Sequence, residues 1–203
     1  LFRSREEVLS SRMIAEPLTL LQCCPAVVDG AAAVVLSTKP IIGHAAPVRV
    51  LASVVQSGVF EVGIVDMTEA EITARSARMA YEQAGLGPSD VSVIELHDAF
   101  TISELLYYEA LGLCERGQAP HLLASGATTL GGKVPVNPSG GLMAKGHPPG
   151  ATGVAQIVEL CEQLQGRAGR RQVINARIGL SQVTGGGIWG VDHAACSIHI
   201  LSI

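Results

Sequence analysis

The residue types best suited to chemistry gather in a glycine- and proline-rich segment, residues 137–153, which contains His147. Glycines let backbone amides approach a ligand closely and adopt positive φ. Pro148 and Pro149 fix the chain just before a helix begins, and the amides at a helix N-terminus favour developing negative charge. A histidine held there can accept a proton or donate a hydrogen bond to an oxyanion. The alternative is a histidine that only fixes a turn, but the surrounding glycines and prolines favour a catalytic His147.

A second histidine lies at an expected sheet edge. Residues 91–96 alternate and then become apolar, which predicts a strand that delivers His97 and Asp98 at its carboxyl end, where open α/β sheets place ligands. His97 can donate to a carbonyl oxygen, directly or through water, whereas Asp98 is better suited to capping the next helix. The three glycines at 185–187 suit either an oxyanion site or a tight turn. Three such pieces at sheet edges and helix starts together favour an active site.

Hydrophobic periodicity and capping residues predict the elements that position these groups. Expected helices cover residues 4–15, from a capping box at Ser4 and Glu7, then 68–84, from a second box at Thr68 and Glu71, then 103–111 and 151–164. Expected strands cover residues 31–36, 48–55, 91–96, 172–176 and 194–201. The order predicts a mixed α/β layer with part of a preceding unit attached.

The composition of the chain argues against several classes of protein. The net charge is 14 − 18 = −4 with no basic stripe, which argues against nucleic-acid binding. No apolar run approaches the roughly 20 residues of a membrane span, and no signal peptide opens the chain. The five cysteines lie mostly among apolar residues, as small buried groups in a reducing cytosol do, so a cytoplasmic location is expected. The chain begins without methionine, and we interpret it as a fragment.

Two motifs make the resemblance to a family specific. Residues 137–141, Asn-Pro-Ser-Gly-Gly, and residues 146–150, Gly-His-Pro-Pro-Gly, resemble the active-site loop of the thiolase superfamily. Residues 95–100 resemble the version in sterol-carrier-protein-2-like thiolases (the lipid-transfer-protein type), where His-Asp replaces the Asn-Glu of ordinary thiolases. Residues 29–33 are similar to the last strand of the family's N-terminal half. The resemblance spans this chain but only about the second half of a family member.

The resemblance implies a layered α/β fold with helices packed on a mixed five-stranded sheet. Residues 1–46 would form the end of the thiolase N-terminal half, with its last helix and strand, and residues 47–203 the C-terminal domain. Such proteins are usually homodimers that act on acyl-coenzyme A, which enters as substrate, so neither a cofactor nor a metal is expected. A missing N-terminal half would complete the active-site cleft.

The same resemblance assigns roles to residues. His147 would activate a cysteine nucleophile and help to form an oxyanion hole, and His97 would replace the asparagine that supports this hole. Gly185 would supply an amide to a second hole. The residues expected to bind substrate or coenzyme A are Asn137, Gly140, Gly141 and Gly146.

Two departures from the family pattern bear on the reaction. The nucleophilic cysteine belongs to the N-terminal half, and none of the five cysteines here lies in a matching motif. The second catalytic cysteine of ordinary thiolases corresponds to Val183, and the alternative cysteine of the sterol-carrier type corresponds to Ala99. Neither side chain can transfer a proton.

Three functions remain open. The leading hypothesis is a thiolase-type acyltransferase for bulky 3-ketoacyl-CoA substrates, such as steroid side-chain or branched-chain intermediates. The second is a retro-aldolase that forms no acyl-enzyme, a type that can work with a small partner subunit. The third is a non-catalytic carrier of lipid or acyl-CoA. Residues 1–203 alone are expected to be inactive.

Overall fold

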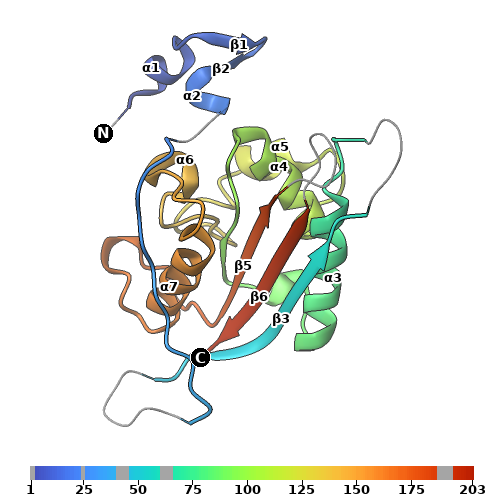
Figure 1. The fold of residues 1–203 in the computed structure, drawn as a ribbon, viewed down its shortest axis with the longest axis vertical. Helices are drawn as coiled ribbons and strands as arrows, with labels where there is room; N and C mark the ends of the chain where they lie inside the picture. The colour runs from blue at the N-terminus through green and yellow to red at the C-terminus, as the bar shows by residue number, and fades with distance from the viewer. Residues whose placement is uncertain (1–2, 24–25, 40–45, 60–65, 187–193) are drawn as a thin grey trace.

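The computed structural model describes residues 3–23, 26–39, 46–59, 66–186 and 194–203. At its centre is a four-stranded sheet in the order β3-β6-β5-β4. These strands are β3 (Arg49–Ser57), β4 (Val93–Glu95), β5 (Ile178–Gly185) and β6 (Ala195–Ser202). Figure 1 shows β3, β6 and β5 side by side. β6 is antiparallel to both of its neighbours, and β4 lies parallel to β5 at one edge. The mixed α/β layer that the sequence predicts is confirmed.

Helices cover both faces of this sheet. α3 (Glu71–Ala84) packs on β3 and β6, whereas α7 (Thr152–Leu164) packs on β5 and β4. Successive side chains of β4 enter different clusters, since Ile94 belongs to the core under α3 and Val93 to the core under α7. The shorter helices are α4 (Thr101–Ala110), α5 (Ala119–Ala124) and α6 (Gly141–Lys145), with single 3-10 turns η1 (Pro88–Asp90) and η2 (Gly169–Arg171). Among the described residues, no helix has the length and apolar character needed to cross a membrane.

The strand predicted at 172–176 is wrong. The segment turns at Asn175, whose φ is 58°, and is not part of the sheet. The amide of Val173 donates to Oε1 of Gln163 at 2.7 Å, so a side chain takes the hydrogen bond that a neighbouring strand would have accepted. The strand that does form, β5, begins at Ile178 and was not predicted.

The described residues form a sheet of four strands, where five were expected. At the open edge of β4, a single parallel bridge joins Ile94 to Val136. The Ile94 amide donates to the Pro135 carbonyl at 3.0 Å, and the Asn137 amide donates to the Ile94 carbonyl at 2.8 Å. Where a fifth strand was expected, the described residues form only this one bridge. Asn137 follows the bridge directly in the chain.

The amino end of α3 also differs from its prediction. Thr68 does not cap the helix, because its hydroxyl donates to Oδ1 of Asp66 at 2.6 Å. The helix begins at Glu71, preceded by Ala70. Its carboxyl end was predicted correctly: Gly85 follows Ala84 with a φ of 66°, a left-handed conformation that glycine adopts without strain.

The first residues form a small unit above the sheet, with α1 (Arg5–Leu9), β1 (Met13–Ala15), β2 (Leu18–Thr19) and α2 (Leu20–Cys23) (Figure 1). The predicted capping box is confirmed, since the Ser4 hydroxyl accepts from the Glu7 amide at 3.2 Å and the Glu7 carboxylate accepts from the Ser4 amide at 2.7 Å. The helix does not continue to Ala15, because Met13–Ala15 pairs with β2 instead.

Residues 26–39 run as an extended trace past α6 and α7 (Figure 1). The strand predicted at 31–36 is wrong, because within the described ranges these residues pair with no strand. Val35 and Leu36 are 84% and 82% exposed, the opposite of a central strand. The division predicted at residues 46 and 47 stays a prediction.

Candidate active site

The structure brings His97 and His147 together. His97 follows β4, whereas His147 lies between α6 and α7, and their ring centroids are 5.1 Å apart with the ring planes at 85°. His97 is buried and His147 is half-buried. The two histidines that were selected by residue type and spacing therefore face each other edge to face in one site.

The backbone of His147 is held by a segment distant in the sequence. Its amide donates to the Ala26 carbonyl at 2.9 Å, and its carbonyl accepts from the Val28 amide at 3.4 Å. Gly146 permits this approach: its φ is 91°, and a Cβ there would lie 2.8 Å from Cγ2 of Val28. The structure thus gives Gly146 a packing role beside His147.

The His147 ring has a further partner at the start of α7. Its Nδ1 lies 2.8 Å from the hydroxyl oxygen of Thr152, which in turn lies 3.0 Å from the carbonyl oxygen of Pro148. Thr152 is buried. Thr152 was not among the residues expected at the site from the sequence; its place in the first turn of the predicted helix was the only available signal.

Two side-chain amides hold the end of β4. The His97 amide donates to Oε1 of Gln182 on β5 at 3.0 Å, and Nε2 of Gln182 donates to the Thr73 hydroxyl at 3.2 Å. From the other side, Oδ1 of Asn137 accepts from the Leu96 amide at 2.8 Å. Asn137, expected at the substrate, therefore supports the backbone between β4 and His97.

Asp98 caps a helix, but it is α6 and not the next helix along the chain, α4, for which the sequence predicted it. Its carboxylate accepts from the Leu142 amide at 2.6 Å and the Met143 amide at 3.3 Å. Burial raises the pKa of Asp98, while these backbone bonds oppose the rise. A Cβ on Gly141, whose φ is 62°, would lie 2.2 Å from Oδ2 of Asp98, and its neighbour Gly140 has a φ of 98°. Only glycine at position 141 leaves room for the cap.

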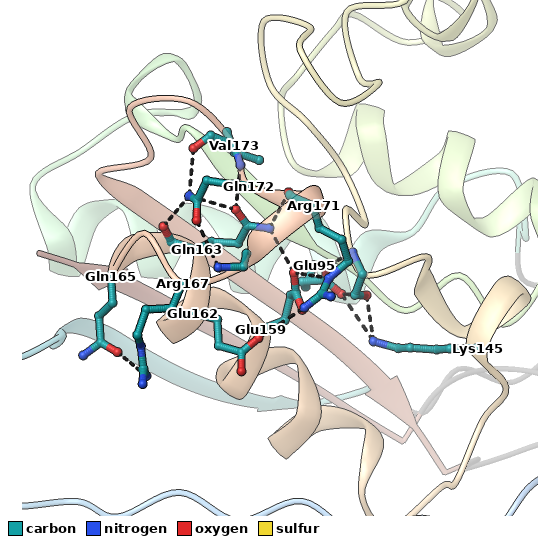
Figure 2. A network of polar contacts seen from close by, with 12 residues as sticks. Glu95, Lys145, Glu159, Glu162, Gln163, Gln165, Arg167, Arg171, Gln172 and Val173 are labelled. Carbon is teal, nitrogen blue, oxygen red and sulfur yellow. Dashed lines mark hydrogen bonds and ion pairs between the residues drawn. The ribbon is translucent and has the colours of Figure 1, made fainter. Parts of the chain in front are cut away.

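A buried carboxylate on β4 anchors the same loop (Figure 2). Glu95 is 1% exposed, and it accepts from the Ser139 amide at 3.0 Å and the Ser139 hydroxyl at 2.6 Å. Lys145 donates to that hydroxyl at 2.7 Å, with its ammonium 3.8 Å from Glu95. Burial raises the pKa of Glu95 to about 7, although Lys145 and Ser139 oppose the rise. Glu95 was not among the expected site residues, although a glutamate within an apolar strand was a signal for it.

A second ion pair lies next to this network in Figure 2. Arg171 binds Glu159 on α7 at 2.8 Å and Glu162 at 3.2 Å. Ser139, Lys145, Glu159 and Arg171 also line a cavity of about 440 Å³ beside residues 31–33. Here the polar groups already pair with one another: Glu95 ties the loop to β4, and Arg171 ties η2 to α7.

Gly185 and Val183 lie on β5. Gly185 is exposed at the end of the strand and pairs with Ala195, while Gly187 lies outside the described residues. Glu95 pairs with Ser181, and the same parallel register continued past the strand end brings His97 toward Val183. A Cβ on Gly153 at the start of α7 would lie 3.4 Å from a methyl group of Val183. An isopropyl group therefore occupies the place expected for a second thiol.

The cysteine thiols that the structure describes are free. Burial raises the pKa of Cys114, Cys161 and Cys196, which lowers the fraction of reactive thiolate at neutral pH. Cys24 lies outside the described residues. These thiols suit packing better than nucleophilic attack.

Comparisons with known proteins define the class. Residues 62–198 match the model of the family described as thiolase C-terminal domain-like. Because the match covers more than half of the chain, this chain belongs to the thiolase C-terminal domain-like family. The resemblance stated from the two motifs is confirmed.

Individual relatives extend this result. The chain is 46% identical over 200 residues to benzoylsuccinyl-CoA thiolase subunit BbsB of Thauera aromatica, covering 96% of this chain and 52% of the relative. It is 46% identical over 190 residues to sterol carrier protein 2 of Rattus norvegicus, covering 90% and 35%. The solved Ltp2-ChsH2(DUF35) aldolase is similar with a TM-score of 0.77 at 25% identity, over 97% of this chain and 50% of that one. The chain thus spans about half or less of the length of these proteins.

Proposed function

We propose that this chain carries the histidine side of a thiolase-type active site that acts on 3-ketoacyl-CoA in the natural protein. The observation that carries the proposal is the approach of His97 and His147 to 5.1 Å, with His147 held by backbone bonds on one side and Thr152 on the other. Membership of the thiolase C-terminal domain-like family supports it.

In this proposal His147 takes a proton from a cysteine thiol supplied by an N-terminal half. The thiolate attacks the 3-keto carbon, the C2–C3 bond breaks, and its electron pair leaves on an acetyl-CoA enolate that is then protonated. The acyl group remains on sulfur until coenzyme A, losing its thiol proton, attacks and releases a shortened acyl-CoA. His97 and His147 stabilise the enolate oxygen, and the Gly185 amide serves a second oxyanion.

Thiolysis by the natural protein and its variants tests this role. Replacement of a general base lowers the rate about 100- to 10,000-fold, so we expect this loss in kcat for His147→Ala. His121→Ala is the matched control, because His121 is exposed on α5 away from the site, and it should retain wild-type kcat. Equal activity in wild-type protein and His147→Ala would contradict the assignment of His147 as the base.

The 203-residue chain alone is expected to give no thiolysis. The physical reason is that the nucleophilic thiol is expected outside it. Turnover by residues 1–203, sensitive to His147→Ala, would show that one of the chain's own cysteines acts and would contradict the split site.

We further propose a bulky acyl substrate. The His-Asp-Ala-Phe sequence at 97–100 and the similarity to benzoylsuccinyl-CoA thiolase and sterol carrier protein 2 support this choice. The test compares kcat/KM for a ring-bearing 3-ketoacyl-CoA with that for a short straight-chain one. A preference for the short substrate would contradict the proposal. The homodimer stays a prediction.

A retro-aldolase is the second candidate, favoured by Val183 at the expected thiol position and by the likeness to an aldolase structure. Here a base removes the 3-hydroxyl proton, the C2–C3 bond breaks, and a carbonyl product leaves the CoA enolate, which is protonated. No acyl-cysteine forms. Mass spectrometry during turnover separates the two, since an acylated cysteine supports the thiolase and its absence during aldol cleavage supports the lyase.

A further inference from the structure

Thr152 occupies a position that decides where the His147 ring carries its proton. Its hydroxyl oxygen lies between two groups, 2.8 Å from Nδ1 of His147 and 3.0 Å from the carbonyl oxygen of Pro148. The side chain is 3% exposed, so water does not readily replace either contact. One hydroxyl proton must serve both neighbours.

One arrangement of that proton makes both contacts hydrogen bonds, while the Pro148 carbonyl also accepts from the amides of Ala151 and Thr152. A carbonyl oxygen accepts and never donates, so the hydroxyl must donate to Pro148 for the 3.0 Å contact to be a hydrogen bond. If the proton pointed at His147 instead, two oxygen atoms would face each other at 3.0 Å with no hydrogen between them. With the proton on the Pro148 side, the Thr152 oxygen accepts from Nδ1–H of His147.

We propose that Thr152 is a positioning residue that keeps neutral His147 protonated on Nδ1, with the lone pair on Nε2. The backbone hydrogen bonds to Ala26 and Val28 fix the position of the His147 backbone. The edge-to-face contact with His97 limits the tilt of the His147 ring. Thr152 then selects the tautomer. The catalytic meaning of this arrangement rests on the proposed function, in which Nε2 is the base.

The acceptor on Nδ1 is uncharged, and this suits a thiol. A carboxylate in that place would stabilise the imidazolium strongly, as is needed to deprotonate an alcohol. A cysteine thiol, with an ordinary pKa of about 8.5, loses its proton far more readily. Thr152 therefore orients the ring without adding a negative charge beside the acyl-CoA enolate.

Long-range ¹H–¹⁵N correlation of histidine-labelled natural protein reads the tautomer directly. We expect the His147 signals, assigned from their loss in His147→Gln, to show a protonated Nδ1 above the titration range. In Thr152→Val they should shift toward the Nε2–H form, while Thr152→Ser should retain the wild-type pattern. Thr129→Val is the control, because it also removes a hydroxyl-to-carbonyl bond, at an exposed site. An Nε2–H tautomer in wild-type protein would overturn the proposal, whether or not the variants fold.

The rate provides a second readout. Loss of one hydrogen bond corresponds to about a tenfold change, so Thr152→Val should lower kcat about tenfold with little change in KM, and Thr152→Ser should restore most of it. If the tautomer is as assigned but His147 proves dispensable for turnover, the proposed function fails and the tautomer assignment stands. If His147 is required while Thr152→Val alters neither tautomer nor kcat, the role of Thr152 fails alone.

Discussion

His97 and His147 face each other from two regions that are built differently. The region of His97 is a strand end inside the domain core, where Gln182 and Asn137 hold the backbone and Glu95 is buried. The region of His147 is a loop whose backbone bonds go to residues 26–28, in a largely exposed segment.

Because of this difference, the two halves of the site should open with different free energies. Opening the end of β4 exposes buried polar groups and core side chains, so it should require nearly global unfolding. Releasing the backbone of His147 requires only that residues 26–28 move away, and Val27 among them is 76% exposed. The position of His97 is therefore a property of the core, and that of His147 depends on a second segment of chain.

The largest expected effect is that of Gly141→Ala, beside Asp98, the residue that follows His97. The new methyl group would lie 2.2 Å from Asp98 at a φ of 62°, so strain and overpacking act together. We expect the free energy of unfolding, measured in urea, to fall by about 3 kcal/mol. Gly117→Ala has a φ of 79° and open space, so it isolates the backbone strain, at about 1 kcal/mol. Equal losses in both variants would show that the chain around Asp98 relaxes to accept the new methyl group. That result would contradict the rigidity assigned to the region of His97.

The next effect is a pH dependence from Glu95. Its pKa is raised to about 7 in the folded protein, so the folded state binds the proton more tightly than the unfolded chain. The resulting stabilisation is fully present below the unfolded pKa of about 4.3 and is lost as the pH rises through about 7. Urea unfolding at several pH values should show this decline in wild-type protein and lose it in Glu95→Gln.

Glu71→Gln is the control for that titration, because Glu71 lies on the surface of α3. Asp98 and Glu104 also have raised pKa values, but both remain in Glu95→Gln, so the difference between the profiles isolates Glu95. Parallel profiles for wild-type protein and Glu95→Gln would contradict the prediction, because they would mean that burial does not disfavour the ionised form of Glu95.

The smallest expected effect falls on His147 alone. Gly30→Ala places a methyl group 2.8 Å from the Pro148 ring, which should push residues 26–30 away. We expect hydrogen exchange at the His147 amide to accelerate about tenfold, as for one weakened hydrogen bond, while the His97 amide is unchanged. Gly150→Ala, with open space around it, should change neither amide. Equal acceleration at both histidines would abolish the distinction between the two regions.

Much of the fold follows from local pattern. Helices predicted at 103–111 and 151–164 form at Thr101–Ala110 and Thr152–Leu164, because long amphipathic repeats leave few alternatives. β5 was missed because its buried residues include Ser181, Gln182 and Thr184, which hide the apolar pattern of a strand. Those polar groups are buried because they have partners elsewhere in the fold, such as the His97 amide for Gln182.

The sequence by itself determined which residues are the candidates for chemistry. His147 stands out among its glycines and prolines, His97 at the end of an apolar strand, and the two motifs define the family. Only the tertiary structure decided how these residues are held. The acceptor of the His147 amide is Ala26, the partner of its ring is Thr152, and the anchor of the loop is buried Glu95. Local spacing encodes residue type and periodicity, whereas hydrogen bonds between distant segments exist only once the chain has folded.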